Sequence, residues 1–227
     1  MSNPPQRRVR SFVRRPGRIT PSQTRALDDL WPTVGVEYDG QPLDLGALFG
    51  RDAEVVLEIG YGNGDTLVEM AATNPEQNFL GVEVHEPGVG HCLIAAEQRG
   101  ITNLRLIMHD AIEVLSEQIP DGSLARINLY FPDPWPKKRH HKRRLIQPTF
   151  LELAARKLRP EGQLFIATDW ANYAEHIDET LEASDRFRVD LTREHAGDAP
   201  IDRPVTKFER RGLAKGHRIR DWRLTRT

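Results

Sequence analysis

Residues 54–66 read EVVLEIGYGNGDT, and this stretch indicates the fold of the chain. The run from Val55 to Ile59 is short and apolar, which is typical of a buried strand. Three glycines then alternate with other residues, and a helix-like pattern follows from about Asp65 to Ala72. Because glycine lets the backbone turn sharply and approach a ligand closely, this strand, turn and helix predict a nucleotide-type binding site.

The rest of the chain alternates between short apolar runs and amphipathic stretches of helical length. This order predicts a doubly wound α/β domain with a mostly parallel sheet. A short helix is expected from about Gln23 to Leu30, capped by Ser22 and ended by Trp31-Pro32, while residues 33–53 look irregular. Further strands are predicted at 79–84, 104–108, 125–131, 163–168, 187–191 and 219–224, and further helices at 88–99, 111–118, 148–158 and 170–183.

Acidic residues follow several of the predicted strands. Ligands of doubly wound sheets bind at the carboxyl ends of the strands, so these acids are expected along one edge. A dinucleotide site would need a third glycine where Asp65 stands, and its carboxylate would repel a pyrophosphate. The pattern Glu58-x-Gly60-x-Gly62-x-Gly64 instead resembles the first motif of S-adenosylmethionine-dependent methyltransferases, whose cofactor carries a sulfonium and an ammonium that favour nearby carboxylates. Glu83 and Asp110, after the next two predicted strands, are proposed to complete this cofactor site.

A second informative stretch is NLYFPDPWPKKRHHKRR at residues 128–144. Its apolar start reads as the end of a buried strand, and three prolines then force the chain out of the sheet. Asp133 therefore lies at a strand end, and eight residues that are all Lys, Arg or His follow at 137–144. Trp135 is open to two interpretations of about equal weight, a platform for a displaced base or a core aromatic.

Positive charge is concentrated in three segments. Residues 1–30, 137–144 and 203–227 hold 22 of the 32 Lys and Arg residues, which leaves 10 basic and 29 acidic residues elsewhere. Such segregation is expected where one face of a protein meets a polyanion. We expect residues 1–32 to form a basic N-terminal arm with a short helix, and residues 33–227 to form the catalytic domain.

The composition also bears on location and metal binding. There is one cysteine, and no apolar run approaches the roughly 20 residues of a membrane span, so a cytoplasmic location without membrane attachment is expected. His140 and His141 lack the spacing of a metal site, so cationic contacts with RNA are the favoured interpretation and no metal is predicted.

Several motifs together resemble one enzyme family. FPDPWPKKRHHKRR, LEIGYGNG, EVHEPGVG, ATDW at 167–170 and PVTKFERRG at 204–212 closely resemble the bacterial tRNA (guanine-N7)-methyltransferases, and the similarity begins at VRSFVRRPGR, residues 9–18. The resemblance implies a Rossmann-like methyltransferase fold, S-adenosylmethionine as cofactor and tRNA as partner. It also points to the guanosine of the variable loop. It implies no obligate protein partner and leaves a monomer or a homodimer open.

The resemblance also carries roles to individual residues. It implies that Glu58, Glu83, Asp110 and Asp133 contact the methyl donor, and that Asp133 is catalytic as well. Substrate contacts are implied for Lys137, Asp169, Thr206, Lys207, Phe208 and Glu209, and an RNA-interacting loop for Arg139, His140, His141, Lys142, Arg143 and Arg144. From the sequence, residues 206–209 look irregular and are expected to form a loop that returns over the pocket.

The chemistry of the acceptor agrees with these roles. Guanine N7 has a free lone pair and no proton, so its methylation needs positioning more than proton abstraction. Because the product ring is cationic, a carboxylate such as that of Asp133 would stabilise the charge that develops. An amino-group nucleic-acid methyltransferase and a non-catalytic RNA-binding module on the same fold are the alternatives, and a small-molecule methyltransferase has no use for the clustered cations.

Overall fold

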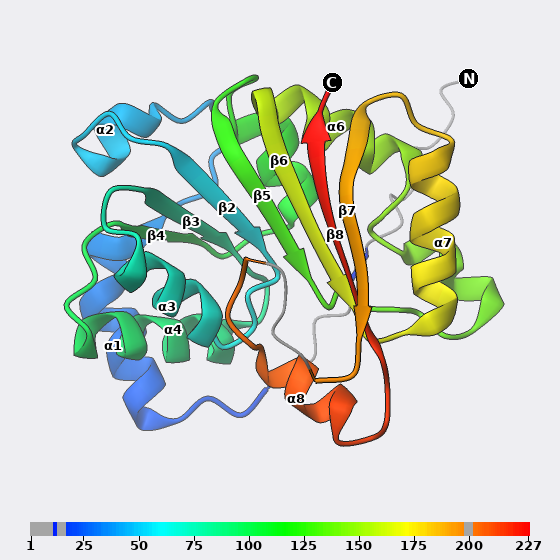
Figure 1. Cartoon of the computed structure of the whole chain (residues 1–227). Helices are drawn as coiled ribbons and strands as arrows, with labels where there is room; N and C mark the ends of the chain where they lie inside the picture. Colours follow the sequence, from blue (N-terminus) through cyan, green and yellow to red (C-terminus); the bar gives the residue numbers. More distant parts are fainter. Residues whose placement is uncertain (1–10, 13–16, 198–201) are drawn as a thin grey trace, which may run out of the picture.

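The computed structural model describes residues 11–12, 17–197 and 202–227, and it confirms the predicted doubly wound sheet (Figure 1). The described part holds an eight-stranded sheet in the order β1-β4-β3-β2-β5-β6-β8-β7. Its strands are β1 Gly35–Val36, β2 Val55–Ile59, β3 Asn78–Val82, β4 Leu104–Ile107, β5 Leu124–Tyr130, β6 Leu158–Thr168, β7 Phe187–His195 and β8 Ile219–Arg226. All neighbouring strands from β1 to β6 are parallel, while β8 is antiparallel to both β6 and β7.

Helices cover both faces of the sheet (Figure 1). One apolar core lies under α1 Pro21–Val34, α3 Asp65–Thr73 and α4 Glu86–Gln98. The other lies under α5 Ala111–Glu113, its π-helical continuation Val114–Gln118, α6 Pro148–Lys157 and α7 Ala171–Glu182. Two short helices, α2 Leu45–Phe49 and α8 Lys207–Leu213, complete the described elements. No helix in these ranges combines the length and apolar character needed to span a bilayer.

Helix α1 is longer than the sequence predicted. Thr20, not Ser22, caps its start, and Gln23 returns a hydrogen bond to the backbone of Thr20 in a capping box. Pro32 does not end the helix, which continues to Val34. The domain boundary predicted after residue 32 therefore lies within a helix, and α1 packs on α4 through a hydrogen bond from Gln23 Nε2 to the Pro87 carbonyl.

Two further predictions need correction or restriction. Residues 33–53 are not wholly irregular, since they contain β1 and α2, and Asp44 caps α2 by accepting from the backbone N–H of Ala47. Most of the predicted basic arm, residues 1–10 and 13–16, lies outside the described residues, so its conformation stays a prediction.

The glycine turn after β2 requires glycine most strictly at Gly64. This residue has φ of +80°, and a Cβ added there would come within 2.3 Å of Cys92 Sγ in α4. Gly100 is a matched position, since it has φ of +62° but open space where a Cβ would stand. Both substitutions to alanine carry the cost of a left-handed residue, about 1–2 kcal/mol, but only Gly64→Ala also creates a clash.

We therefore expect Gly64→Ala to lose about 1–3 kcal/mol more stability than Gly100→Ala. Denaturant unfolding of both variants beside the wild type measures the difference. Equal losses would show that α4 moves away from the turn at little cost.

Candidate functional site

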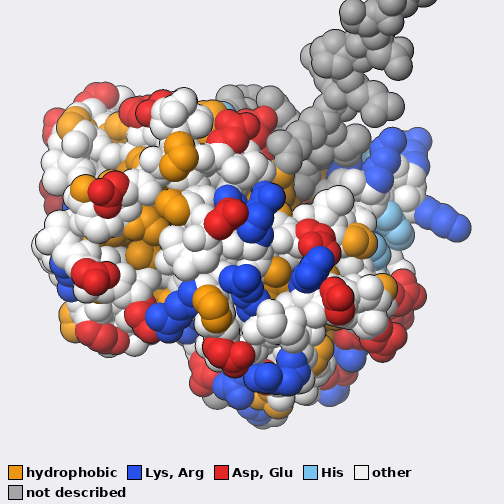
Figure 2. Space-filling model, turned by 90° about the horizontal axis from the view of Figure 1, so that it is seen from above, with side chains coloured by type: hydrophobic (Ala, Val, Ile, Leu, Met, Phe, Trp, Pro, Cys, Tyr) orange, Lys and Arg blue, Asp and Glu red, His pale blue; other side chains and the backbone are white. Residues whose placement is uncertain are grey.

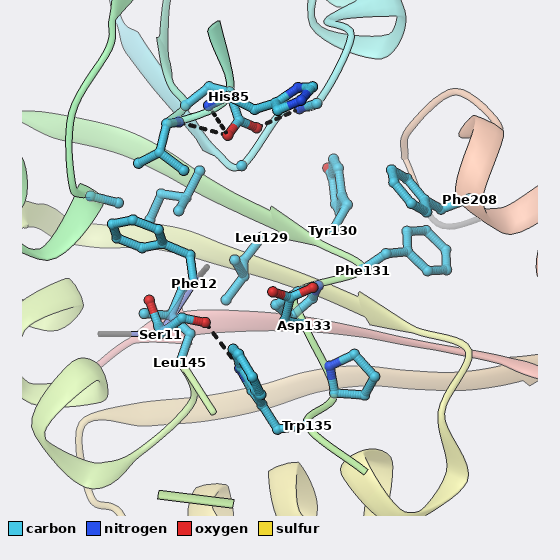
Figure 3. Close-up of a pocket in the computed structure, with 18 of the residues that line it drawn as sticks. Ser11, Phe12, His85, Leu129, Tyr130, Phe131, Asp133, Trp135, Leu145 and Phe208 are labelled. Carbon is cyan, nitrogen blue, oxygen red and sulfur yellow. Dashed lines mark hydrogen bonds between the residues drawn. The ribbon is translucent and has the colours of Figure 1, made fainter. Parts of the chain in front are cut away.

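A cavity of about 750 Å³ opens at the carboxyl ends of the parallel strands. It lies beside the point where the strand order reverses between β2 and β5, which is where ligands bind in such sheets. Figure 3 shows side chains from distant segments meeting around it. The lining includes Ser11, Phe12, Gly60, Gly62, Glu83, His85, His109, Tyr130, Phe131, Asp133, Trp135, Lys137, His140 and Phe208.

Glu83 is fixed in this cavity by backbone donors. Its Oε2 accepts from the N–H of Gly62 at 2.9 Å, and its Oε1 accepts from the N–H groups of Val84 at 2.6 Å and His85 at 3.0 Å. The carboxylate therefore ties the end of β3 to the glycine turn after β2. Three donors hold it in one orientation, with its remaining acceptor capacity available to hydroxyl groups of a ligand.

Glu58 lies behind the lining rather than in it. Its side chain is buried in β2, and its Oε2 has no hydrogen-bond partner among the described residues. Burial raises the pKa of this carboxyl to about 8, against the opposing charges of Arg126 and Arg203. A buried carboxyl oxygen without a hydrogen-bond partner, two residues before the glycine turn, would be stabilised by a cationic group, so the residues present suit a ligand that carries an ammonium or sulfonium.

Asp110 and Gly64 also lie outside the lining. Asp110 is buried and caps α5, because its Oδ1 accepts from the backbone N–H of Ile112 at 2.9 Å. Its neighbours His109 and Ala111 line the cavity instead. The sequence did not single out Tyr38, whose ring stacks on His109 with centroids 3.7 Å apart. No motif could have revealed this pair, since Tyr38 stands 71 positions away in a segment read as irregular.

The loop that carries Asp133 is held in a constrained backbone conformation. Phe131 and Trp135 have φ of +53° and +47°, which is uncommon for residues other than glycine and is characteristic of functional sites. Arg144 Nε donates to the Pro134 carbonyl at 3.0 Å, and Trp135 Nε1 donates to the Ser11 carbonyl at 2.9 Å. These contacts fix the loop so that the exposed Asp133 faces the cavity (Figure 3).

Trp135 is a wall of the cavity, not a core aromatic. The guanidinium of Arg143 lies 4.0 Å from the centre of its ring, and the His140 ring meets it edge-on at 5.9 Å. A displaced base could therefore stack only on the face of the indole that Arg143 leaves open.

The polybasic loop forms a 3-10 helix, Lys138–Arg143, on which Lys138, Arg139 and Lys142 are exposed. Loss of water and the charges of Arg139 and Arg143 lower the pKa of His140 from its ordinary value, and its predicted cationic contact with RNA stays a prediction. His141 lies 3.1 Å from an Arg144 guanidinium nitrogen, so its Nε2 accepts. Among the described residues no cluster of His, Cys, Asp and Glu is arranged to hold a metal ion.

Arg144 is buried rather than presented to a substrate. Besides Pro134, it donates to the side-chain oxygen of Asn172 at 2.7 Å, and it lies 4.9 Å from the centre of the Tyr173 ring. Arg144 is therefore not exposed for a contact with RNA in this structure. We infer instead that it positions the loop of Asp133.

Residues 206–209 do not form the expected irregular loop. Thr206 caps α8 in a capping box with Glu209, because Thr206 accepts from the Glu209 N–H at 3.0 Å and the Glu209 carboxylate returns to the Thr206 N–H. Phe208 is 54% exposed and lines the cavity, and Lys207 is exposed. Glu209 and Thr206 are buried, which argues against direct contacts between these two residues and the substrate. Such contacts stay predictions.

A buried ion cluster lies beneath α8, and the sequence did not reveal it. Arg203 donates to Asp221 Oδ1 through Nε at 3.0 Å and through a terminal nitrogen at 2.8 Å, and it also bonds Glu209. His195 Nε2 lies 2.8 Å from the second oxygen of Asp221. The four residues come from β7, β8, α8 and the segment before it, so no sequence spacing connects them.

The cluster changes the interpretation of the basic segment 203–227. Arg203, Arg218, Arg220 and Arg223 are all paired with acids of this chain. They were expected to face a polyanion, but the antiparallel strand β8 places them beside acidic neighbours. Figure 2, which views the molecule from above, shows Lys and Arg side chains interspersed with Asp and Glu on that face.

Asp169 lies at the end of β6, outside the lining of the cavity. His217 Nδ1 is 3.0 Å from its Oδ2, and a Cβ added at Gly212 would come within 2.7 Å of the same oxygen. Asp169 therefore packs directly against α8, and its predicted substrate contact stays a prediction.

Solved structures share the fold at low sequence identity. The crystal structure of the 16S rRNA methyltransferase KamB superposes with a TM-score of 0.59 at 15% identity, covering 82% of this chain and 95% of that one. The structure of TrmN from Thermus thermophilus gives a TM-score of 0.57 at 18% identity, covering 90% of this chain and 48% of that one. These likenesses establish a methyltransferase-type fold.

Sequence comparisons are more specific. A family model described as "Putative methyltransferase" matches residues 52–222. A tRNA (guanine-N(7)-)-methyltransferase of Cronobacter sakazakii is 56% identical over 217 residues, covering 96% of this chain and 91% of the relative. One of Halorhodospira halophila is 55% identical over 222 residues, covering 97% and 95%. Together with the fold and the cavity, this similarity over nearly the whole length shows that the chain belongs to the tRNA (guanine-N(7)-)-methyltransferase family.

Proposed function

We propose that this protein transfers the methyl group of S-adenosylmethionine to N7 of a guanine in tRNA, at the guanosine of the variable loop. The observation that carries the proposal is the position of Asp133, held by a constrained loop in the same cavity as Glu83 and the glycine turn. The proposed reaction and substrate class rest on family membership. The proposed position in the variable loop rests on the resemblance of the sequence motifs. A tRNA substrate supports a cytoplasmic location.

The cofactor would supply an electrophilic methyl group on a sulfonium sulfur. Glu83 is suited to accept hydrogen bonds from two ribose hydroxyls, because backbone donors already fix its orientation. Glu58 would pair with a cationic group through its open oxygen. Asp110 would act mainly by shaping the start of α5, where His109 and Ala111 reach the cavity.

Asp133 would act on the acceptor base. Guanine N7 needs no base to remove a proton, so a carboxylate in the cavity stabilises the positive charge that develops on the ring. Lys137 and Phe208 line the same cavity and would lie beside the base. The exposed cations Lys138, Arg139 and Lys142 would bind phosphates of the tRNA backbone.

The test is a transfer assay with purified protein, labelled S-adenosylmethionine and unmodified tRNA, followed by nucleoside analysis. The expected product is 7-methylguanosine, and a tRNA whose variable-loop guanosine is replaced by adenosine should not be labelled. An N6- or N4-methylated base would favour an amino-group methyltransferase. Binding of tRNA without transfer would favour a non-catalytic RNA-binding module.

The raised pKa of Glu58 predicts proton release when the cofactor binds. With a pKa of about 8, this carboxyl is mostly protonated at pH 7 in the free protein. A cation at its open oxygen favours the ionised form, so binding at pH 7 should release about 0.9 proton. The release should disappear above about pH 9, where the carboxyl is already ionised.

Calorimetric binding of S-adenosylmethionine in buffers of different ionisation enthalpy measures this number. Glu58→Gln, which cannot ionise, is the matched control and should release no proton. Equal proton counts for the two proteins would show that Glu58 does not meet the cationic part of the cofactor.

A further inference from the structure

Helix α8 and the turn after it present three exposed cations. Lys207 and Arg211 are four residues apart and share one side of α8, and Lys215 follows at the same interval in the turn after the helix. We call these three residues the α8 cation face. Within the described residues none of them forms an ion pair, in contrast to Arg220 and Arg223 of strand β8 and Arg218 directly before it.

The opposite side of α8 is anchored in the protein. Glu209 is fully buried and bonded to Arg203, which also pairs with Asp221 of β8. Gly212 packs against Asp169 so closely that a Cβ would not fit. The carboxylate of Glu209 is therefore paired with Arg203 inside the protein, while the α8 cation face remains on the surface. A helix held in this way presents its charges in a fixed position, which reduces the entropy lost on binding.

Helix α8 also borders the cavity. Phe208 projects from α8 toward Phe131 and the cavity (Figure 3), and it stands one residue after Lys207. Lys137 and His140 line the same cavity from the polybasic segment. Two cationic elements, distant in sequence, therefore flank the place where Asp133 lies. A polyanionic strand whose base enters the cavity would pass over both.

We propose that the α8 cation face binds phosphates of the tRNA backbone beside the target nucleotide, with Arg211 and Lys215 as contacts that act together with the polybasic segment 137–143. Phosphate contacts fix the register of a nucleic acid on a protein, so this face sets which nucleotide reaches Asp133. The inference rests on the proposed function, because it takes tRNA as the substrate.

The experiment compares two double variants that lose the same charge. Arg211→Gln/Lys215→Gln removes two cations of the α8 face, and Arg218→Gln/Arg223→Gln removes two cations that are paired with Glu194 and Asp202. Binding of unmodified tRNA is measured for each between about 0.05 and 0.3 M salt, with S-adenosylmethionine affinity and thermal midpoint as checks of folding.

For Arg211→Gln/Lys215→Gln we expect the slope of log K against log salt to fall by about 2, one per lost phosphate contact. At about 0.1 M salt this corresponds to roughly 100-fold weaker binding. The affinity for S-adenosylmethionine should stay unchanged. The control pair should shift the slope by less than about 0.5.

Equal effects of the two double variants would overturn the inference, since they would show only a change in overall charge. An unchanged affinity in the α8 variant would overturn it as well. In either case a wild type that forms 7-methylguanosine leaves the proposed function standing, and a wild type that binds no tRNA refutes both.

Discussion

Replacing Asp133 by asparagine should lower the rate of methyl transfer about 100- to 1000-fold at saturating cofactor and tRNA. The substitution keeps the shape of the side chain but removes the charge that would face the developing cation on the guanine ring, and losses of this size are typical when one such electrostatic contact is removed. The side chain lies on a loop fixed by Arg144 and Trp135, so the loop itself should keep its conformation.

Single-turnover transfer to unmodified tRNA measures the rate, and cofactor affinity is measured beside it because Asp133 is also proposed to contact the methyl donor. Glu69→Gln, which removes an exposed carboxylate from α3, is the control and should behave like the wild type. A rate for Asp133→Asn within about threefold of the wild type, with cofactor bound, would remove Asp133 from the reaction.

Replacing Arg203 by methionine should destabilise the protein by about 3–5 kcal/mol. The guanidinium is buried between Glu209 and Asp221, and its loss leaves two buried carboxylates without their cation. Breaking a buried pair in this way is costly because the remaining charge has neither water nor a partner. Arg203→Lys keeps the positive charge but cannot bond Glu209 and Asp221 with the same geometry. It should therefore lose less stability than Arg203→Met.

Arg218→Met is the matched control, because Arg218 forms an exposed pair with Glu194. Exposed pairs contribute at most about 1 kcal/mol, since water screens them and both side chains are mobile when apart. Denaturant unfolding of the three variants gives the comparison. If Arg203→Met were no worse than Arg218→Met, the cluster would be an incidental contact and would not anchor α8.

Much of the fold follows from local patterns. The apolar run at 55–59, the glycines after it and the alternation of strands with helices predicted the parallel sheet, because each depends on residues that are neighbours in the chain. The edge on which Glu83 and Asp133 meet followed from topology alone, since parallel strands bring their carboxyl ends together.

The sequence-based prediction failed in two ways: it missed one local capping signal, and it could not identify charge partners that are distant in the chain. The capping box at Thr206 made a helix of a segment read as a loop, although the Thr and Glu spacing was present in the sequence. The paired arginines of β8 looked like the exposed lysines of the polybasic loop, because a composition count cannot tell which cations have an acid across the sheet.

The sequence by itself determined the sheet, the acids at its edge and the family to which the motifs belong. Only the tertiary structure showed that Glu58 and Asp110 lie behind the cavity, that Arg144 supports the loop of Asp133, and that Glu209 is neutralised by Arg203. The physical reason is that burial and charge pairing depend on which side chains surround a residue in space. Those neighbours come from segments that no local pattern connects.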